Sequence, residues 1–326
     1  MAVRAGDQGQ DQTQSKLPII VIAGPTASGK SALALALAAA YGGTIINGDA
    51  LQIYRDLRIL TARPDAAAEA AARHRLYGVL DAAERGSVGR WRDLAEAEIA
   101  SAHAAGRLPI VVGGTGLYLR ALLTGLAEVP DVPAGVRDEA IALHRALGGT
   151  EFRRRLAEHD PAAAARLNEG DTQRLIRAFE VVRATGAPLA AWQARAAAVS
   201  RVSAATILLM PPRPALYAAC DARFAAMIAH GGFDEAAALA ARNLSPDLPA
   251  MKAVGVPELL RHLRGELSRE GAIVAGQQST RRYAKRQTTW FRHQLDAGLI
   301  LDAQFSESLL QCSCHFIDGF LLTHRR

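Results

Sequence analysis

The sequence is poor in cysteine, which argues against a fold held together by disulfide bonds. Three of its 326 residues are cysteines: Cys220, Cys312 and Cys314. Secreted domains that are held together by disulfide bonds have many cysteines in an even number. An odd, small number of cysteines fits a reducing compartment instead. Cys312, Cys314 and His315 lie close together, but no second pair of metal ligands follows at a suitable spacing. This argues against a zinc site.

Long apolar runs and targeting signals are also missing. No stretch of 18 or more apolar residues occurs, so the sequence predicts no membrane-spanning helix. The N-terminus lacks the pattern of a signal peptide. Residues 1–16 are rich in Gln, Gly and Asp and are predicted to form a disordered tail. We therefore expect a cytoplasmic protein with no membrane partner, acting as a monomer.

The chain does contain enough apolar sequence for a large core, together with an excess of positive charge. Half of its residues are hydrophobic, and 326 residues suffice for one large domain or for a core with a smaller lobe. The formal net charge is +6 and the isoelectric point is about 9.5. A basic balance suggests a polyanionic partner, provided that the charge is clustered.

The most informative stretch is a Gly-rich turn between a strand and a helix. Residues 24–31, GPTASGKS, match G-x-x-x-x-G-K-[ST] at every fixed position. The apolar residues 19–22 before it predict a buried strand, and residues 32–41 after it predict a helix. This context is typical of a P-loop, whose amides and helix N-terminus bind a di- or triphosphate. Lys30 would add a full charge, and the Ser31 hydroxyl could ligate Mg²⁺.

Further strands alternate with helices, which predicts a parallel, doubly wound α/β sheet. Residues 44–47 form a predicted strand that delivers Asp49 to its carboxyl end, where ligands of such sheets bind. Residues 108–112 form another, which ends in the second Gly-rich turn, residues 113–116. Further strand predictions cover residues 76–80 and 204–210.

The middle of the chain is predicted to be an all-helical insertion. Residues 136–198 contain no good strand candidate, and Asp160 and Asp171 are suitable N-caps for two of the helices. Arg174 and Arg177 share a helix face, either as RNA contacts or as solvated charges. The predicted organisation is a tail at 1–16, a P-loop NTPase-like core at 17–128 and 201–300, the insertion at 129–200, and a C-terminal tail at 301–326.

Residues 279–294 are predicted to form a basic helix. Arg281, Arg282, Lys285, Arg286 and Arg292 cluster on one arc of it. Tyr283, Trp290 and Phe291 fall on the other arc, which we expect to face the core. The stretch contains no acidic residue. Like charges this close repel one another unless an anion is present, so the basic arc fits an RNA backbone or a diphosphate.

No second apolar strand ends in an acidic residue, which a P-loop nucleotidase usually has to hold Mg²⁺. The residues alone therefore leave the reaction open. Asp49 is the main acidic group expected at the sheet edge, where it could act as a metal ligand or as a base. A small-molecule phosphotransferase that uses ATP is one possibility, and an RNA-binding P-loop module is another. The sequence has no N-K-x-D signal for guanine, which disfavours a GTPase-like module.

Six blocks in order resemble the tRNA dimethylallyltransferase family over residues 17–295. They are GPTASGKS at 24–31, INGDALQIYRDL at 46–57 with TARP at 61–64, VVGGTGLYLRALLTGL at 111–126, NEGDTQRLIRAFEV at 168–181, MKAVGVPEL at 251–259 and STRRYAKRQTTWFR at 279–292. The resemblance implies transfer of the dimethylallyl group from dimethylallyl diphosphate to N6 of adenosine 37, in tRNAs that read codons beginning with U. It also implies Mg²⁺ as cofactor and the anticodon stem-loop as the bound part of the tRNA.

The resemblance also implies residue roles. Asp49 would be the general base, with Thr26 and Thr115 as further catalytic residues and Ser31 as the metal ligand. The implied diphosphate-binding residues are Gly24, Thr26, Ala27, Ser28, Gly29, Lys30, Ser31 and Arg223. The implied tRNA-binding residues are Asp49, Ala50, Leu51, Gln52, Thr115, Gln173, Arg174, Leu175, Ile176, Arg177, Lys252, Gly255, Arg281 and Lys285. The chain departs from the family pattern at Ala50, where the family often has Ser, and at 252 and 255–257, where it often has Arg and Gly-Tyr-Arg.

Overall fold

The computed structural model describes residues 16–195 and 200–324 and divides the chain into two compact units. One unit combines Met1–Leu123 with Ser200–Arg326, and the other is Thr124–Val199. The predicted disordered tail lies outside the described residues, apart from Lys16. The first unit contains the sheet, and the second is helical.

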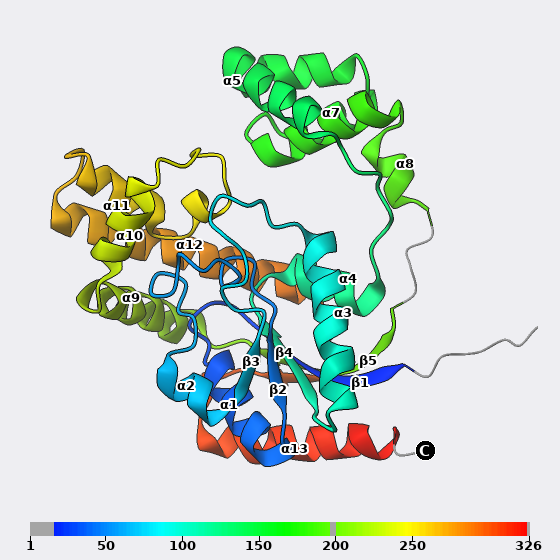
Figure 1. Ribbon diagram of the computed structural model, residues 1–326, viewed down its shortest axis with the longest axis vertical. Coiled ribbons are helices and arrows are strands. Elements are labelled where there is room, and N and C mark those ends of the chain that lie inside the picture. The colour runs from blue at the N-terminus through cyan, green and yellow to red at the C-terminus, as the bar shows by residue number, and fades with distance from the viewer. Residues whose placement is uncertain (1–15, 196–199, 325–326) are drawn as a thin grey trace, which may run out of the picture. The chain divides into compact units, whose positions relative to one another are not determined.

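The first unit is built on a sheet of six strands, all parallel, in the order β3-β2-β4-β1-β5-β6 (Figure 1). The strands are β1 (Leu17–Ala23), β2 (Thr44–Asn47), β3 (Arg73–Arg75), β4 (Pro109–Gly113), β5 (Val202–Leu209) and β6 (Leu299–Leu301). The central strand β1 carries the P-loop at its carboxyl end. The predicted fold class, a P-loop-like parallel sheet with a helical insertion, is confirmed.

Alternate residues of the central strands enter opposite cores, as strand geometry requires. Ile20 and Ile22 pack with one set of helices, and Ile19 and Val21 pack with the other; all four are fully buried. The first set is α1 (Lys30–Tyr41) and α13 (Glu307–Leu322). The second set is α3 (Val88–Ala104) and α4 (Gly116–Thr124). Both faces of the sheet are therefore covered.

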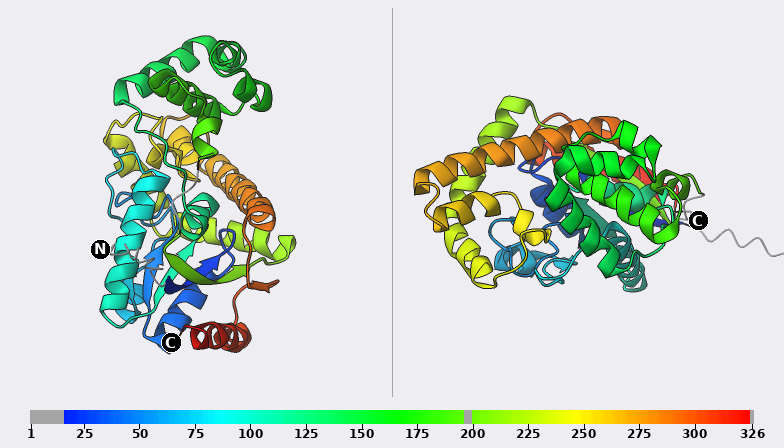
Figure 2. Two further views of the ribbon diagram at one scale, coloured as in Figure 1. Left: turned by 90° about the vertical axis from the view of Figure 1, so that its right-hand side faces the viewer. Right: turned by 90° about the horizontal axis from the view of Figure 1, so that it is seen from above.

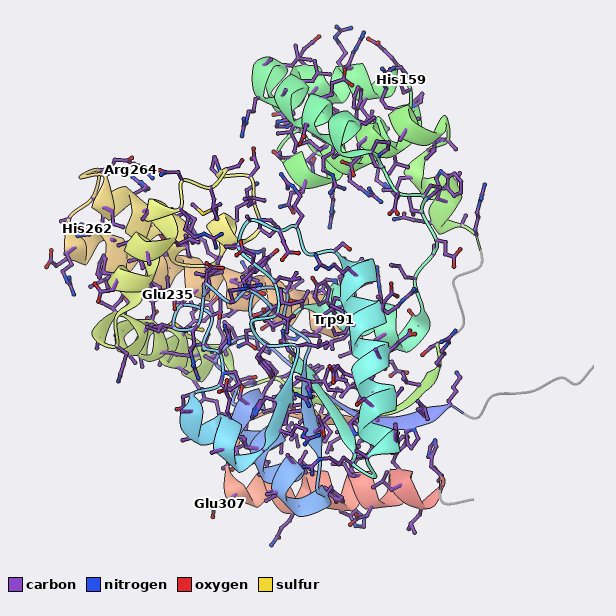
Figure 3. All side chains as sticks on the ribbon, in the orientation of Figure 1. Trp91, His159, Glu235, His262, Arg264 and Glu307 are labelled. Atoms are coloured by element: carbon purple, nitrogen blue, oxygen red, sulfur yellow. The ribbon has the colours of Figure 1, made fainter. Side chains whose placement is uncertain are left out.

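The remaining helices of this unit are α2 (Ala66–Ala71), α9 (Arg213–Ala229), α10 (Gly232–Ala241), the 3₁₀ turn η1 (Ala250–Lys252), α11 (Val256–Leu263) and α12 (Arg269–Gln294). The long helix α12, drawn in orange in Figure 2, packs against α9. Glu235 on α10, labelled in Figure 3, accepts the amides of Arg58, Ile59 and Leu60 at 2.6–2.9 Å. This carboxylate holds the loop after β2 in place.

The second unit consists of α5 (Ala134–Ala157), which breaks at Gly148, α6 (Pro161–Arg166), α7 (Thr172–Thr185) and α8 (Leu189–Gln193). Asp160 caps α6 by accepting the Ala163 amide, and Asp171 stands at the start of α7, as predicted. Phe152 and Leu175 are fully buried in its core. Glu180 is buried beside them and forms ion pairs with Arg137 and Arg177 at 2.7 and 2.6 Å.

Two predictions about the first unit are wrong. The strand predicted at 76–80 is instead β3 at Arg73–Arg75, because Leu76 and Gly78 take positive φ and turn the chain away. The C-terminal tail predicted at 301–326 is ordered: β6 pairs with β5, and α13 buries Ile317 against the sheet. The apolar side chains of this helix recur at helical spacing, which is the pattern of a helix with one buried face: Leu309, Leu310, Phe316, Ile317, Phe320 and Leu321.

Candidate active site

The site begins at the carboxyl end of β2, where the chain turns into Asp49. Asn47 is fully buried, and its side-chain amide donates to the carbonyl oxygens of Asp49 and Leu76 at 3.0 Å each. Its side-chain oxygen accepts the Asp49 amide at 2.8 Å. Trp91, which reaches from α3 toward the sheet in Figure 3, donates its indole N–H to the Asn47 carbonyl at 2.8 Å. These bonds fix Asp49 at the sheet edge that ligands use.

The P-loop lies at the same edge, and its amides are available to an anion. Ala27 and Gly29 have φ of 64° and 92°, and residues of this kind turn successive N–H groups to one side. Within the described ranges, the amides of residues 27–31 donate to no acceptor. The buried Ser28 hydroxyl has no partner there either. Together with the N-terminus of α1, these donors form an anion-binding turn.

Two cationic side chains meet at this turn. Lys30 donates its ammonium to the Pro25 carbonyl at 2.6 Å, and Arg223 of α9 donates to the Thr26 hydroxyl. Burial, with the nearby Arg223 charge, lowers the pKa of Lys30 to about 7. Burial also lowers the pKa of Arg223, whose Nε is enclosed without a hydrogen-bond partner. Two enclosed cations that destabilise each other indicate that a negatively charged group belongs between them.

Gln287 of α12 joins the P-loop to the second Gly-rich turn, residues 113–116. Its side-chain oxygen accepts the Thr26 amide, and its side-chain amide donates to the Gly114 carbonyl, each at 2.8 Å. Gln287 is only 6% exposed, so both bonds are shielded from water. Because its amide is already used, Thr26 has its hydroxyl, and not its N–H, to offer a ligand.

The carboxylate of Asp49 is held by one of its two oxygens. Oδ1 accepts the Leu51 amide at 2.9 Å, whereas Oδ2 makes no hydrogen bond within the described part of the chain. The next amide, that of Ala50, donates to the Thr115 hydroxyl at 2.9 Å. Thr115 accepts in this bond and therefore keeps its own proton for another partner. A fixed carboxylate with one unpaired oxygen is arranged to accept a proton.

A pocket opens beside these groups, with a polar end and an apolar wall. Thr26, Asp49 and Arg223 line the polar end, and Leu51, Leu60, Phe224, Met227 and Val254 supply the wall. Tyr283 of α12 also lines the pocket. Burial and the Asp49 charge raise the pKa of Tyr283, which keeps the phenol neutral. The arrangement suits a ligand with an anionic head and an apolar tail.

The pocket position of Tyr283 corrects the prediction that all three aromatic residues of the basic helix face the core. Phe291 is buried and Trp290 packs against the same core, as predicted. Tyr283 lines the pocket instead, because its turn of α12 passes above the two Gly-rich turns. Gln287, one turn further on, is the other site residue that the sequence analysis missed. The signal in the sequence is that Gln287 is a polar residue at helical spacing between two buried residues, Ala284 and Phe291.

A magnesium ion fits the oxygen donors at the P-loop. Ser31 stands in the first turn of α1 with its side chain exposed. The described residues contain no group of three or more His, Cys, Asp or Glu side chains that could hold a metal ion by themselves. Mg²⁺ commonly takes one or two protein oxygens together with phosphate oxygens and water. The Ser31 hydroxyl is suitable for such a shared site.

The other predicted tRNA-binding residues of the first unit do not line the pocket. Gln52 donates to the carbonyls of Thr61 and Ala62, which ties down the loop after β2. Gly255 precedes α11, and Lys252 lies 3.5 Å from Asp247. On α12, Arg281 pairs with Asp221 at 2.6 Å, and Lys285 is exposed.

The predicted tRNA-binding residues 173–177 lie in the second unit, on α7. Gln173 and Arg174 are exposed, whereas Leu175 is fully buried in the helical core. The Leu175 side chain is therefore a core residue, and a tRNA contact there would fall to the backbone. Ile176 is half-buried, and Arg177 is held by the buried Glu180.

Fold and site together define a class: an α/β protein with a P-loop-like anion site, a fixed carboxylate and an apolar pocket. A family model described as IPP transferase matches residues 52–294. A tRNA dimethylallyltransferase of Rhodospirillum centenum is 59% identical over 287 residues, covering 87% of this chain and 91% of that protein. One of Rhodospirillum rubrum is 55% identical over 312 residues, covering 94% and 96%.

Solved structures agree with these matches. A full-length tRNA isopentenylpyrophosphate transferase of Bacillus halodurans is 32% identical, with a TM-score of 0.67, over 93% of this chain and 96% of that one. A eukaryotic dimethylallyltransferase acting on tRNA has the same fold, with a TM-score of 0.78 and 24% identity over 95% and 80%. The chain belongs to the IPP transferase family. None of these matches favours the phosphotransferase alternative. No helix among the described residues is long and apolar enough to cross a membrane.

Proposed function

We propose that this protein is a prenyltransferase that moves the dimethylallyl group of dimethylallyl diphosphate to tRNA. The names of its relatives support this activity. The structural observation that carries the proposal is the pocket itself, in which Arg223 lies at the same end as Asp49, against an apolar wall. The buried ammonium of Lys30 lies close enough to feel the charges of both residues. An ATP-dependent kinase has no need of an apolar wall beside the phosphates.

The diphosphate binds where the P-loop amides, Lys30 and Arg223 converge. An anion there relieves the repulsion between the two cations and satisfies the unpaired donors. The Ser31 hydroxyl would hold a bound Mg²⁺, which would neutralise part of the diphosphate charge. The Thr26 hydroxyl, already oriented by Arg223, donates to the oxygen that bridges the diphosphate to the prenyl carbon. Charge that develops on that oxygen is stabilised as it leaves.

The acceptor nitrogen is N6 of an adenine, as the family resemblance implies. N6 forms a bond to C1 of the dimethylallyl group, the C1–O bond breaks, and its electrons leave with the diphosphate. Asp49 Oδ2 takes the proton from N6, while the Leu51 amide holds Oδ1 in place. Proton removal matters because the N6 lone pair is delocalised into the ring. Leu51, Phe224 and Met227 shelter the five-carbon chain from water.

The tRNA partner is recognised through its anticodon stem-loop, with adenosine 37 as the target in tRNAs that read codons beginning with U. The exposed basic arc of α12, which includes Lys285 and Arg286, suits a phosphate backbone. Exposed Gln173 and Arg174 on α7 offer a second contact. A base in a single-stranded loop leaves its stack at a cost of a few kcal/mol, which makes such a loop a suitable target.

The protein acts as a monomer in the cytoplasm. One compact unit supplies every residue that lines the pocket, so a monomer suffices for the proposed chemistry. Support for a reducing compartment comes from the thiols, because Cys220, Cys312 and Cys314 are all free.

The test is an incubation of the protein with labelled dimethylallyl diphosphate, Mg²⁺ and unmodified tRNA with A36-A37-A38. The expected result is label in the tRNA and release of diphosphate, with no need for ATP. A parallel reaction with labelled ATP, with and without RNA, tests the kinase alternative. Phosphate transfer from ATP, without any prenyl transfer, would overturn the proposal.

A further inference from the structure

We propose that the C-terminal segment 302–306, between β6 and α13, positions the P-loop for diphosphate binding. The ligand named here rests on the proposed function above, whereas the contacts do not. The segment follows the residues matched by the family model, which end at 294, and lies beyond all six sequence blocks. Its role is to hold two carbonyl groups of the P-loop on the side away from the ligand.

Two hydrogen bonds join the segment to the P-loop. The side-chain amide of Gln304 donates to the Ala27 carbonyl at 3.1 Å. The backbone amide of Phe305 donates to the Ser28 carbonyl at 3.4 Å. Both acceptors lie in the middle of the Gly-rich turn, between the residues that would surround a phosphate.

Because each peptide unit is rigid, fixing its carbonyl group also fixes the direction of its N–H group. A trans peptide unit is planar, with its C=O and N–H pointing in opposite directions. The Ala27 carbonyl shares its peptide unit with the Ser28 amide, and the Ser28 carbonyl shares its unit with the Gly29 amide. Holding the two carbonyls on the outside therefore aims two unpaired amides at the ligand side. Without this support, either peptide unit can rotate and present a carbonyl oxygen to the anion.

The conformation of the turn needs such support. Ala27 has φ of 64°, which residues with a side chain rarely adopt. Gly29 has φ of 92°, and a Cβ there would lie 2.8 Å from the Phe305 Cβ. The segment thus packs against the turn closely enough to need glycine at this position.

The segment is itself anchored at both ends. On one side, β6 pairs with β5, and the Met210 amide donates to the Leu301 carbonyl at 2.8 Å. On the other side, α13 buries Ile317, and Tyr41 of α1 donates to the Asp318 carboxylate at 2.9 Å. An anchored segment can hold a turn, whereas a frayed one cannot.

The experiment compares Gln304→Met, which keeps the length of the side chain and removes its donor, with Ser308→Ala. Ser308 lies just beyond the segment, in the first turn of α13, and its hydroxyl bonds to that of Ser306. The loss of one positioning hydrogen bond predicts about fivefold weaker binding of inorganic diphosphate by calorimetry. The KM for dimethylallyl diphosphate should rise by a similar factor, while kcat and the KM for tRNA stay unchanged. Ser308→Ala should behave as wild type in all four measurements.

Hydrogen exchange provides a second measurement that needs no ligand. Gln304→Met should exchange the Phe305 amide, which donates to the Ser28 carbonyl, faster than wild type, with the amides of the sheet unchanged. If Gln304→Met binds diphosphate and exchanges its amides as Ser308→Ala and wild type do, the positioning role is wrong and the proposed function is unaffected. If wild type fails to bind inorganic diphosphate, the proposed function and the positioning role fail together. If Gln304→Met melts well below wild type and kcat falls with KM, the segment is merely structural.

Discussion

The buried ammonium of Lys30 makes diphosphate binding dependent on pH in a defined direction. In the empty site its pKa is lowered to about 7, by burial first and the Arg223 charge second. A bound diphosphate favours the charged form and raises this pKa again. At pH 9 about one Lys30 in a hundred is protonated, compared with about half at pH 7. Binding should therefore weaken about fiftyfold over this interval through Lys30, with the uptake of close to one proton at pH 8.

The assay is titration calorimetry with inorganic diphosphate at pH 7, 8 and 9, in buffers of different ionisation enthalpy. Lys30→Met is the matched control, because it lacks the titrating group and still reports the titration of the ligand and of other residues. The predicted fiftyfold change is the loss of diphosphate affinity from pH 7 to pH 9 in wild type beyond the loss in Lys30→Met. Parallel pH profiles and equal proton uptake in wild type and Lys30→Met would refute the reasoning.

Three other changes have expected outcomes. Arg223→Gln should raise the KM for dimethylallyl diphosphate about a hundredfold in steady-state assays, because a charge-assisted contact is lost, whereas an unchanged KM would place the diphosphate elsewhere. Gln287→Met leaves the Thr26 amide and the Gly114 carbonyl unpaired and should lower the free energy of unfolding by about 2 kcal/mol in urea titrations; a stability equal to wild type would contradict the bridging role. Burial opposes the ionisation of Glu180, but Arg137 and Arg177 outweigh it and lower its pKa, so the pair network stabilises the helical unit above pH 4.5 and is lost as pH falls through the lowered value. Glu180→Gln should remove that acid-dependent step from melting curves recorded between pH 3 and 7, and an unchanged step would refute the assignment.

The P-loop core could be predicted because its determinants are local. The spacing GPTASGKS, the apolar run before it and the helix formers after it act within some twenty residues. Asp49 was placed correctly at the sheet edge by the same reasoning, since the carboxyl ends of parallel strands meet there. Arg223 was assigned through the family resemblance, and the structure brings it to the Thr26 hydroxyl.

The remaining features depend on contacts between distant parts of the chain. Gln287 lies 261 residues from Thr26, and its role is apparent only when α12 crosses both Gly-rich turns. Strand β6 depends on pairing with the edge of β5, which no local pattern reveals, whereas the apolar spacing of α13 is a local signal. Leu175 is among the implied tRNA-binding residues, yet the fold of the helical unit buries its side chain completely.

The central claim is that Asp49 accepts the proton while the P-loop holds the diphosphate. The most direct measurement is single-turnover prenyl transfer by Asp49→Asn, alongside calorimetric binding of inorganic diphosphate to the same protein. The asparagine keeps the shape and the acceptor for the Leu51 amide but loses the base. The account predicts that the transfer rate falls by about a hundredfold or more, with diphosphate affinity within about twofold of wild type. Transfer at the wild-type rate would contradict it.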